Sequence, residues 1–301
     1  MTPLGSSLRA RSKAVRRFER RILGRRPPSS AHLCFVVGCE RSGTSPLVRV
    51  LHSHREIVMG LERYASLYND MRVRRDPTLI DLDLFSPERF LDFRPEDTHR
   101  APPDFGARHY EVARNRFESG AVARIGDKVL PPNVWIVRTL ASKFPESSFV
   151  FIYRDQLKVC DSWQRRAGDP DDAWVSGNDF RSGHEHWVDG LDVVDWLEGS
   201  IEPERLFVIR CEWFFADDPT YLEALVGFLG LDMDPSMAAN HSERSAEFRR
   251  REAATVSRLT AEQRAFLHER AHIDRVTHLD AVAAACRDGS PRPAPARFVE
   301  R

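Results

Sequence analysis

A single short stretch, FVVGCERSGTSPLVRVL at residues 35–51, constrains the fold of this 301-residue chain more than any other feature. It completes a continuous apolar run, residues 32–38, that ends at a glycine, which is typical of a strand buried on both faces of a sheet. A helix follows the loop, with Thr44 or Ser45 suited to cap it and Pro46 suited to its first position. Such a strand–loop–helix unit points backbone N–H groups and the positive helix end at one spot, which predicts an anion site.

The residues of the loop indicate which class of anion it binds. Gly38 and Gly43 stand five residues apart, as in the phosphate-binding pattern G-x-x-x-x-G-K-[ST] of nucleoside triphosphatases. Here Thr44 takes the place of the lysine, Ser45 follows it, and the only cation inside the loop is Arg41. Arginine offers a forked donor to a phosphate, and the hydroxyl groups add neutral donors. The loop therefore predicts a phosphate ligand that is bound without a metal ion.

Strand and helix patterns alternate along the chain. The expected strands are residues 32–38, 56–59, 148–153 and 205–210, and the expected helices are residues 132–144, 156–166, 184–199 and 219–230. Strands separated by helices favour a parallel sheet, because each parallel connection must cross back over the sheet. We therefore expect a three-layer α/β fold with a mainly parallel central sheet flanked by helices.

Composition divides the chain into three parts. Residues 1–30 form a basic arm, in which residues 9–26 carry nine basic side chains and one acidic one with apolar residues at helical spacing. This segment suits a helix packed on the domain or a weak contact with anionic lipid. Residues 31–286 form one domain, in which residues 70–120 are an aperiodic, substrate-facing insertion of helices and loops. Residues 287–301 are expected to be a loose tail.

The balance of charges and the cysteines exclude several classes of protein. The 45 basic and 45 acidic residues give a formal net charge of zero, which argues against nucleic acid as a partner. The five cysteines lack C-x-x-C spacing, which is typical of reduced thiols in a cytoplasmic protein. No apolar run is long enough for a membrane span or a signal-peptide core. The arginine-rich composition suggests a bacterial source, and nothing in the sequence predicts an oligomeric state.

The loop and a second sequence element together resemble a known family. FVVGCERSGTSPLVRVL resembles the 5′-phosphosulfate loop, commonly G-x-x-[RK]-S-G-T-[ST], of sulfotransferases that use 3′-phosphoadenylyl sulfate (PAPS). In that family a strand followed by Arg, with Ser eight residues later, binds the 3′-phosphate of PAPS, and FVFIYRDQLKVCDSW has this spacing. The resemblance implies a P-loop-NTPase-like fold. The donor-binding residues that it implies are Arg41, Ser42, Gly43, Thr44, Ser45, Arg154 and Ser162.

The resemblance also implies catalytic residues. Sulfuryl transfer needs a base for the acceptor proton and cations on the bridging and sulfuryl oxygens. Glu62 in GLERY is similar in context to the glutamate base of the carbohydrate and tyrosylprotein branches, whereas GDKVLPP (126–132) lacks the histidine of the small-molecule cytosolic branch. The family pattern assigns Lys128 to the sulfuryl group and Arg41 to the leaving phosphate. An alternative for Glu62 is a helix-surface carboxylate paired with Arg63.

The implied reaction moves the sulfuryl group of PAPS to a hydroxyl, or to an amine, and releases adenosine 3′,5′-bisphosphate without a metal ion. Acidic residues beside Trp174, in the stretch 167–180, suit a polar acceptor such as a carbohydrate, glycolipid or natural product. The stretch EFRRR (247–251) is either a charged helix face, which we favour, or the basic loop that completes the 3′-phosphate site in some branches.

Two alternatives stay open at this point. A P-loop kinase or phosphotransferase is disfavoured by the absent loop lysine and the absent Mg²⁺-binding carboxylate. A catalytically inactive nucleotide-binding protein is conceivable, because Cys211 stands where the family often has a tyrosine.

Overall fold

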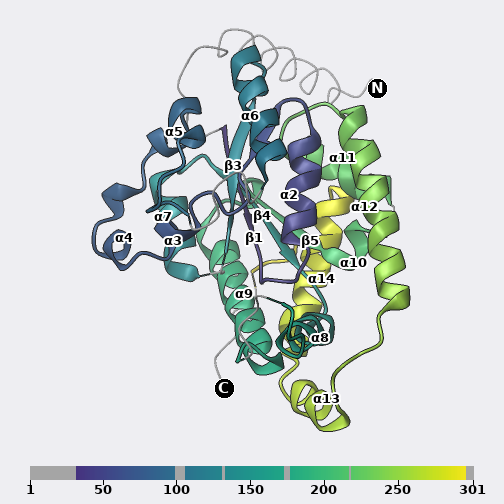
Figure 1. Ribbon diagram of the computed structural model, residues 1–301. Helices are drawn as coiled ribbons and strands as arrows, with labels where there is room; N and C mark the ends of the chain where they lie inside the picture. The colour runs from purple at the N-terminus through teal and green to yellow at the C-terminus, as the bar shows by residue number, and fades with distance from the viewer. Residues whose placement is uncertain (1–31, 99–105, 131–132, 173–176, 217, 296–301) are drawn as a thin grey trace, which may run out of the picture.

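The computed structural model describes residues 32–98, 106–130, 133–172, 177–216 and 218–295, so the predicted basic arm lies outside the described residues. Within these ranges, one parallel sheet has the strand order β2-β3-β1-β4-β5 (Figure 1). The strands are β1 (Leu33–Val37), β2 (Ile57–Met59), β3 (Arg124–Val129), β4 (Ser148–Tyr153) and β5 (Leu206–Arg210). The predicted α/β fold with a parallel central sheet is confirmed.

The order of the strands places a topological switch at β1. The chain leaves β1 toward β2, returns to place β3 between them, and then continues to β4 on the other side of β1. Parallel connections are right-handed, so the helices that follow β1 and β3 cover opposite faces of the sheet. Ligands of open parallel sheets bind at the carboxyl ends of the strands beside such a switch. The fold therefore directs a ligand to the loops that follow β1, β3 and β4.

Helices flank both faces of the sheet. In Figure 1, α2 lies beside α12, and α9 packs against α7 and α8 on the other side. The longer helices are α2 (Thr44–Ser53), α6 (Ala107–Ser119), α7 (Val134–Lys143), α8 (Gln156–Ala167), α9 (Phe180–Ser200), α11 (Pro219–Phe228), α12 (Pro235–Ala254), α13 (Ala261–His268) and α14 (Ile273–Asp288). The shorter helices are α3 (Ala65–Tyr68), α4 (Met71–Arg75), η2 (Pro77–Leu79), η3 (Leu82–Phe85), α5 (Pro87–Leu91), η4 (Pro203–Arg205) and α10 (Cys211–Phe214).

The hydrophobic core is centred on β1, which is buried along its whole length. Phe35 in β1 contacts the rings of Phe85, Phe144 and Phe149, with ring centroids between 5.5 and 6.1 Å apart. The residues predicted for the inner face of α2 are also buried; they are Leu47, Val50 and Leu51. All five cysteines are buried free thiols, as predicted. The central strand is thus held rigidly, which fixes the start of the loop that follows it.

The structure corrects several expectations from the sequence. β3 was not predicted, because Asp127 and Lys128 interrupt its apolar pattern. Of α12 only the charged helix face at residues 247–251 was predicted, and α13 and α14 were not predicted. Neither Thr44 nor Ser45 caps α2: the helix begins at Thr44, and Gly43 occupies the cap position in the left-handed region with no side-chain cap. Pro46 is therefore the third helical residue instead of the first. The first turn of α2 consequently keeps its N–H groups directed into the loop.

The C-terminal region reaches the edge of the sheet. Helix α14 continues through Asp288, so the predicted start of the tail at residue 287 falls within its last turn. Arg292 then donates a hydrogen bond to the carbonyl oxygen of Leu206 in β5, and residues 296–301 lie outside the described residues. In the described part of the chain, no helix has the length and apolar character that a bilayer span needs.

Gly126 offers a test of the strand packing. A Cβ atom at this position of β3 would lie 1.6 Å from the carbonyl oxygen of Cys34 in β1. We expect Gly126→Ala to lower the free energy of unfolding by about 3 kcal/mol or more, because the paired backbones must separate. Gly199→Ala in α9 is the control: nothing lies within 4 Å of its Cβ, so a gain of up to about 1 kcal/mol is expected. Equal urea midpoints for the two variants would contradict this account.

Candidate functional site

The predicted site residues gather at the carboxyl edge of the sheet. The glycine loop, with Arg41, follows β1, and Glu62 follows β2. Lys128 is the second-last residue of β3, and Arg154 follows β4 directly. Four separate strands thus deliver their charged residues to one edge, as the strand order requires.

The loop after β1 has a strained and closely packed backbone. Arg41 and Gly43 both have left-handed conformations, with φ of 72° and 91°. Such a conformation is uncommon for an arginine and is found most often at functional sites. A Cβ at Gly38 would lie 2.2 Å from the carbonyl oxygen of Ile152, and one at Gly43 would lie 2.7 Å from the Cys211 sulfur. The small Cys211 side chain, where the family often has tyrosine, therefore packs directly beneath the loop.

A first group of polar residues forms around Lys128. Its ammonium nitrogen lies 2.6 Å from Glu62 Oε1 and donates to the hydroxyl oxygen of Ser45 at 2.7 Å. Lys128 is 1% exposed and Glu62 is 7% exposed, so this ion pair is almost fully withdrawn from solvent. Removing one partner of a buried ion pair typically costs about 3–5 kcal/mol, because a buried charge is left alone. The structure thus brings together the predicted base, the predicted electrophile and one loop serine.

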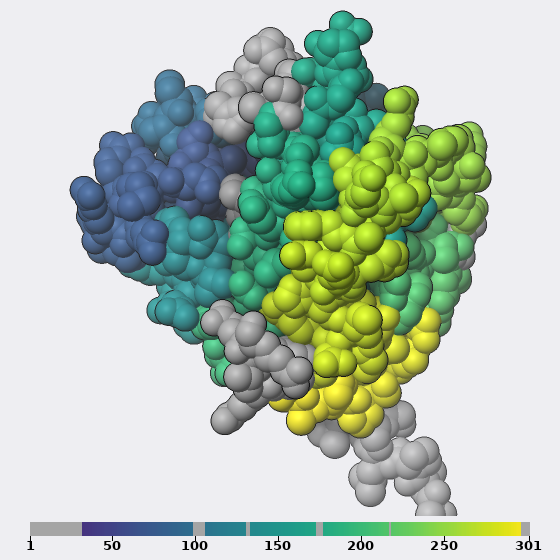
Figure 2. Space-filling view, turned by 90° about the horizontal axis from the view of Figure 1, so that it is seen from below, coloured from purple at the N-terminus to yellow at the C-terminus, as the bar shows by residue number. Residues whose placement is uncertain are grey.

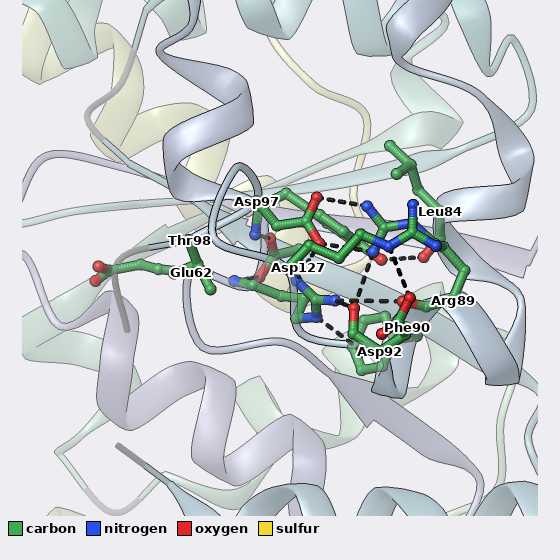
Figure 3. A network of polar contacts seen from close by, with 11 residues as sticks. Glu62, Leu84, Arg89, Phe90, Asp92, Asp97, Thr98 and Asp127 are labelled. Carbon is green, nitrogen blue, oxygen red and sulfur yellow. Dashed lines mark hydrogen bonds and ion pairs between the residues drawn. The ribbon is translucent and has the colours of Figure 1, made fainter. Parts of the chain in front are cut away.

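The alternative pairing of Glu62 with Arg63 is wrong. The Arg63 guanidinium points away from Glu62 and lies 3.0 Å from Asp97 Oδ2. It also donates to backbone carbonyl oxygens at 2.8 Å from Phe90 and 2.6 Å from Asp92. Figure 3 shows this network on one side of the turn, with the Glu62 carboxylate extending to the other side. Glu62 is therefore a directed, buried carboxylate and not a surface charge.

A second group of polar residues forms around Arg41. Its Nε donates to the Ser162 hydroxyl at 2.9 Å, and Arg154 Nη1 donates to the Arg41 carbonyl oxygen at 3.1 Å. Arg41, Arg154 and Ser162, which come from the loop and from both ends of the Arg…Ser element, are thus in direct contact. The bonds of Arg41 place its guanidinium at the Ser162 end of the site, whereas the Lys128 group lies at the Ser45 end. Ser42 is buried in the loop between β1 and α2, and Thr44, the first residue of α2, is buried as well.

The second group contains cations that sequence reasoning missed. Lys158 lies one helical turn before Ser162 on α8, and its Nζ is 3.0 Å from Glu252 Oε2. The same Glu252, near the end of α12, also forms an ion pair with Arg154. The burial of Arg41 lowers its pKa, and the nearby positive charges of Arg166 and Arg154 lower it further. Cations that repel one another at one spot indicate a site for an anion.

The end of α12 and the segment after it lie against α8 beside this group. The Ser257 hydroxyl and the Arg258 backbone N–H donate to Asp161 Oδ1 at 2.9 and 2.5 Å, next to Ser162 in sequence. Figure 2 shows the end of α12 and the following residues lying across this face of the molecule. The stretch EFRRR, in contrast, forms a charged helix face on α12, where Arg251 pairs with Glu247. The contacts of Ser257 and Arg258 with Asp161 join residues 96 and 97 positions apart, so no local sequence signal predicts them.

A histidine neutralises the acidic residue of the loop. His186 Nδ1 on α9 lies 3.0 Å from Glu40 Oε2. The hydrogen bond and negative charge of Glu40 raise the pKa of His186 above its ordinary value, and burial opposes this effect. The negative charges of Asp189 and Glu185 raise it further. Protonated His186 thus compensates a carboxylate that would otherwise repel an anion in the loop.

The Glu40–His186 pair predicts a pH dependence of stability. Because the pKa of His186 is higher in the folded state than its unfolded value of about 6.5, the folded state binds the proton more tightly. The stabilisation is fully present below pH ~6.5 and is lost as the pH rises through the raised folded pKa. We expect the free-energy difference between the wild type and His186→Gln to shrink by about 0.5–1 kcal/mol from pH 6 to pH 9 in urea unfolding. A constant difference over this range would contradict the pairing.

Comparisons with known proteins agree with this fold. The structure is similar to the sulfotransferase domain of the Synechococcus PCC 7002 olefin synthase, with a TM-score of 0.51 and 14% identity over 82% of this chain and 93% of that chain. It is also similar to the sulfotransferase domain of the curacin biosynthetic pathway, with a TM-score of 0.47 and 17% identity over 78% of this chain and 96% of that chain. No curated protein matches the sequence. The sequence pattern of the sulfotransferase family matches residues 34–235, well over half of the 301 residues, and the chain therefore belongs to this family.

Proposed function

We propose that this chain transfers the sulfuryl group of PAPS to an acceptor hydroxyl and releases adenosine 3′,5′-bisphosphate, with Glu62 as the general base. The observation that carries the proposal is the contact of Lys128 with both Glu62 and Ser45, because it joins the base to the anion loop. A carboxylate that can accept a proton and an ammonium that can stabilise negative charge thus stand beside one predicted phosphate site.

The two groups of polar residues match the two phosphate groups of the donor. The 5′-phosphate suits the loop and the first turn of α2, where N–H groups and the hydroxyls of Ser42, Thr44 and Ser45 lie close together. The 3′-phosphate suits Arg154 and Ser162, as the family pattern implies. Lys158, which lies on α8 with Ser162, adds a third donor. Arg41, bonded to Ser162, must turn toward the 5′-phosphate to assist the leaving group.

The transfer step follows from these assignments. The acceptor oxygen attacks sulfur in line with the bond to the 5′-phosphate; the new O–S bond forms as the old S–O bond breaks, and the acceptor proton passes to Glu62. Lys128 exchanges its contact with Glu62 for the sulfuryl oxygens, while Arg41 and the loop N–H groups stabilise the leaving phosphate. Side chains and N–H groups supply the charge stabilisation in this scheme, so it requires no metal ion.

The acceptor that we propose is a polar hydroxyl compound, such as a carbohydrate, a glycolipid or a natural product, with an amine as a further candidate. A glutamate base is typical of the carbohydrate and tyrosylprotein branches of the family. The insertion at residues 70–120 borders this base, because the Thr98 hydroxyl donates to the Glu62 carbonyl oxygen at 3.2 Å. The free thiols favour a cytoplasmic site of action, and the arginine-rich composition favours a bacterial source. The weak lipid contact through residues 9–26 stays a prediction outside the described residues.

Calorimetric titration of the purified chain separates this proposal from a kinase. Adenosine 3′,5′-bisphosphate should bind without Mg²⁺, and ATP should bind poorly. The Glu252 carboxylate now occupies Arg154 and Lys158, so a 3′-phosphate must displace it. We therefore expect Glu252→Gln to bind adenosine 3′,5′-bisphosphate about 3–10 times more tightly, since the competing charge is removed. Glu247→Gln, on the same helix, is the control and should not change the affinity. Tight binding of ATP that depends on Mg²⁺ would refute the proposal.

Glu62→Gln tests the base directly. The amide oxygen can still accept from Lys128 but no longer balances its buried charge, so the variant should be less stable to urea than the wild type. Its affinity for adenosine 3′,5′-bisphosphate, measured on the folded variant, should stay within about threefold, while turnover should fall by about 10²–10⁴-fold. Turnover is measured as release of adenosine 3′,5′-bisphosphate from PAPS in the presence of sugars, phenols and hydroxylated lipids. Near-normal turnover of the variant would refute the role of Glu62. A wild type that binds the nucleotide but transfers to no acceptor would favour an inactive binding protein.

A further inference from the structure

A buried carboxylate that has no part in the proposed transfer lies at the centre of the site. Asp127, beside Lys128 in β3, is 0% exposed. Its carboxylate accepts backbone N–H groups from Arg63 at 2.9 Å, from Tyr64 at 2.9 Å and from Lys128 at 2.8 Å. Burial raises the pKa of Asp127 to about 7, and these three donors oppose that rise. A carboxylate whose oxygens accept several main-chain N–H groups fixes the geometry of that backbone.

The backbone that Asp127 holds is the turn that presents Glu62. Glu62 has φ of 59°, a left-handed conformation that costs a residue with a side chain about 1–2 kcal/mol. In this conformation the two following N–H groups point the same way, and they converge on the Asp127 oxygens. Gly60, before the turn, permits the approach: a Cβ there would lie 2.4 Å from Asp127 Oδ1. The strained turn and the buried carboxylate are therefore parts of one arrangement.

Two adjacent residues of β3 thus hold one turn in two ways. Asp127 binds the main chain just after Glu62, and Lys128 binds the Glu62 carboxylate itself at 2.6 Å. Side chains of adjacent strand residues point to opposite faces, so the two contacts approach the turn from different directions. The Lys128 N–H also donates to Asp127. The same carboxylate therefore binds the backbone of Lys128 and the backbone that follows Glu62.

Other contacts of the turn secure a different part of it. The Arg63 guanidinium is bound by Asp97. Asp97 in turn pairs with Arg89, as Figure 3 shows. These ion pairs join the turn to the segment around α5 through a side chain that points away from Glu62. Several side chains form hydrogen bonds with the backbone of this turn. Among those in the described part of the chain, only the Asp127 side chain also accepts from the Lys128 N–H. Its carboxylate thus links the backbone after Glu62 to the backbone of Lys128.

We propose that Asp127 is a positioning residue that holds the Glu62 turn and Lys128 in the relative geometry that proton acceptance and charge stabilisation require. The inference rests on the proposed function, because the roles of Glu62 and Lys128 belong to that reaction. Asp127 itself touches neither the donor nor the acceptor in this scheme. Its loss should therefore affect the transfer step and spare the binding of the donor nucleotide.

Asp127→Asn tests the proposal. The variant keeps one acceptor oxygen and places an NH₂ group against the Tyr64 N–H, so it loosens the turn with little change in volume. At pH 8, where the wild-type carboxyl is ionised, we expect kcat to fall about 10–100-fold while the Kd for adenosine 3′,5′-bisphosphate and the KM for PAPS change less than threefold. The acceptor used is the one that supports the fastest release of adenosine 3′,5′-bisphosphate by the wild type. Hydrogen exchange should rise in the peptides that contain residues 62–66 and 127–130.

Asp234→Asn is the matched control. Asp234 is also a buried carboxylate, 3% exposed, that accepts backbone N–H groups, from Ser236 at 2.8 Å and from Arg55 at 3.3 Å, but it lies at the start of α12. Its variant should keep kcat and the exchange of the Glu62 turn at wild-type values. Equal losses of kcat in the two variants would overturn the proposal, because any buried carboxylate would then have the same effect.

A second variant, Gly60→Ala, tests the same contact if Asp127→Asn does not fold. Gly60→Ala keeps the Asp127 charge but places a methyl group against its carboxylate, so it should give the same loss of kcat with nucleotide affinity retained. Unchanged kcat in both variants, or a loss of nucleotide affinity equal to the loss of kcat, would overturn the positioning role. A wild type that transfers no sulfuryl group would instead refute the proposed function, so the two failures are distinguishable.

Discussion

The buried ion pair between Lys128 and Glu62 is the interaction on which the geometry of the site depends. Two opposite charges withdrawn from water are stable only when they are close together and their remaining hydrogen-bonding capacity is used. Here the ammonium group also binds Ser45, and Asp127 fixes the backbone on both sides of the pair. The pair thus joins the ends of β2 and β3 to the start of α2. A substrate that separates the two charges enters a site whose backbone is already in place.

Several charged residues elsewhere in the site are paired with residues of opposite charge. Arg154 and Lys158 contact Glu252, and the loop residue Glu40 contacts His186. Because these pairs are partly exposed, each contributes little to stability and can be exchanged for the phosphate groups of a ligand at small cost. If the proposed function holds, specificity for a doubly phosphorylated donor would come from replacing carboxylates with phosphates of higher charge.

The sequence predicted those parts of the fold and site that depend on local patterns. The strand–loop–helix at residues 35–51 and the strands β4 and β5 have uninterrupted apolar runs, so their positions follow from periodicity. β3 was not predicted because Asp127 and Lys128, two residues of the candidate site, interrupt its apolar run. The contacts of Asp127 with the turn after Glu62 join residues more than 60 positions apart, and the contact of Glu252 with Arg154 spans 98 positions. Such pairings arise from the strand order and the return of α12, and a single sequence carries no local trace of them.

The residues with a left-handed backbone conformation give independent support for the same candidate site. In the described part of the chain, the residues other than glycine with positive φ are Arg41, Glu62 and His272. Two of these three are the predicted cation of the loop and the predicted base. Glycine would adopt either conformation without strain, so the side chain itself is what the position requires. At each site a neighbour compensates the strain: Arg154 binds the Arg41 carbonyl oxygen, and Asp127 binds the N–H groups that follow Glu62. The strained backbone and its supports are thus built around two charged side chains, which is the arrangement expected when chemistry, rather than folding, selects the residue.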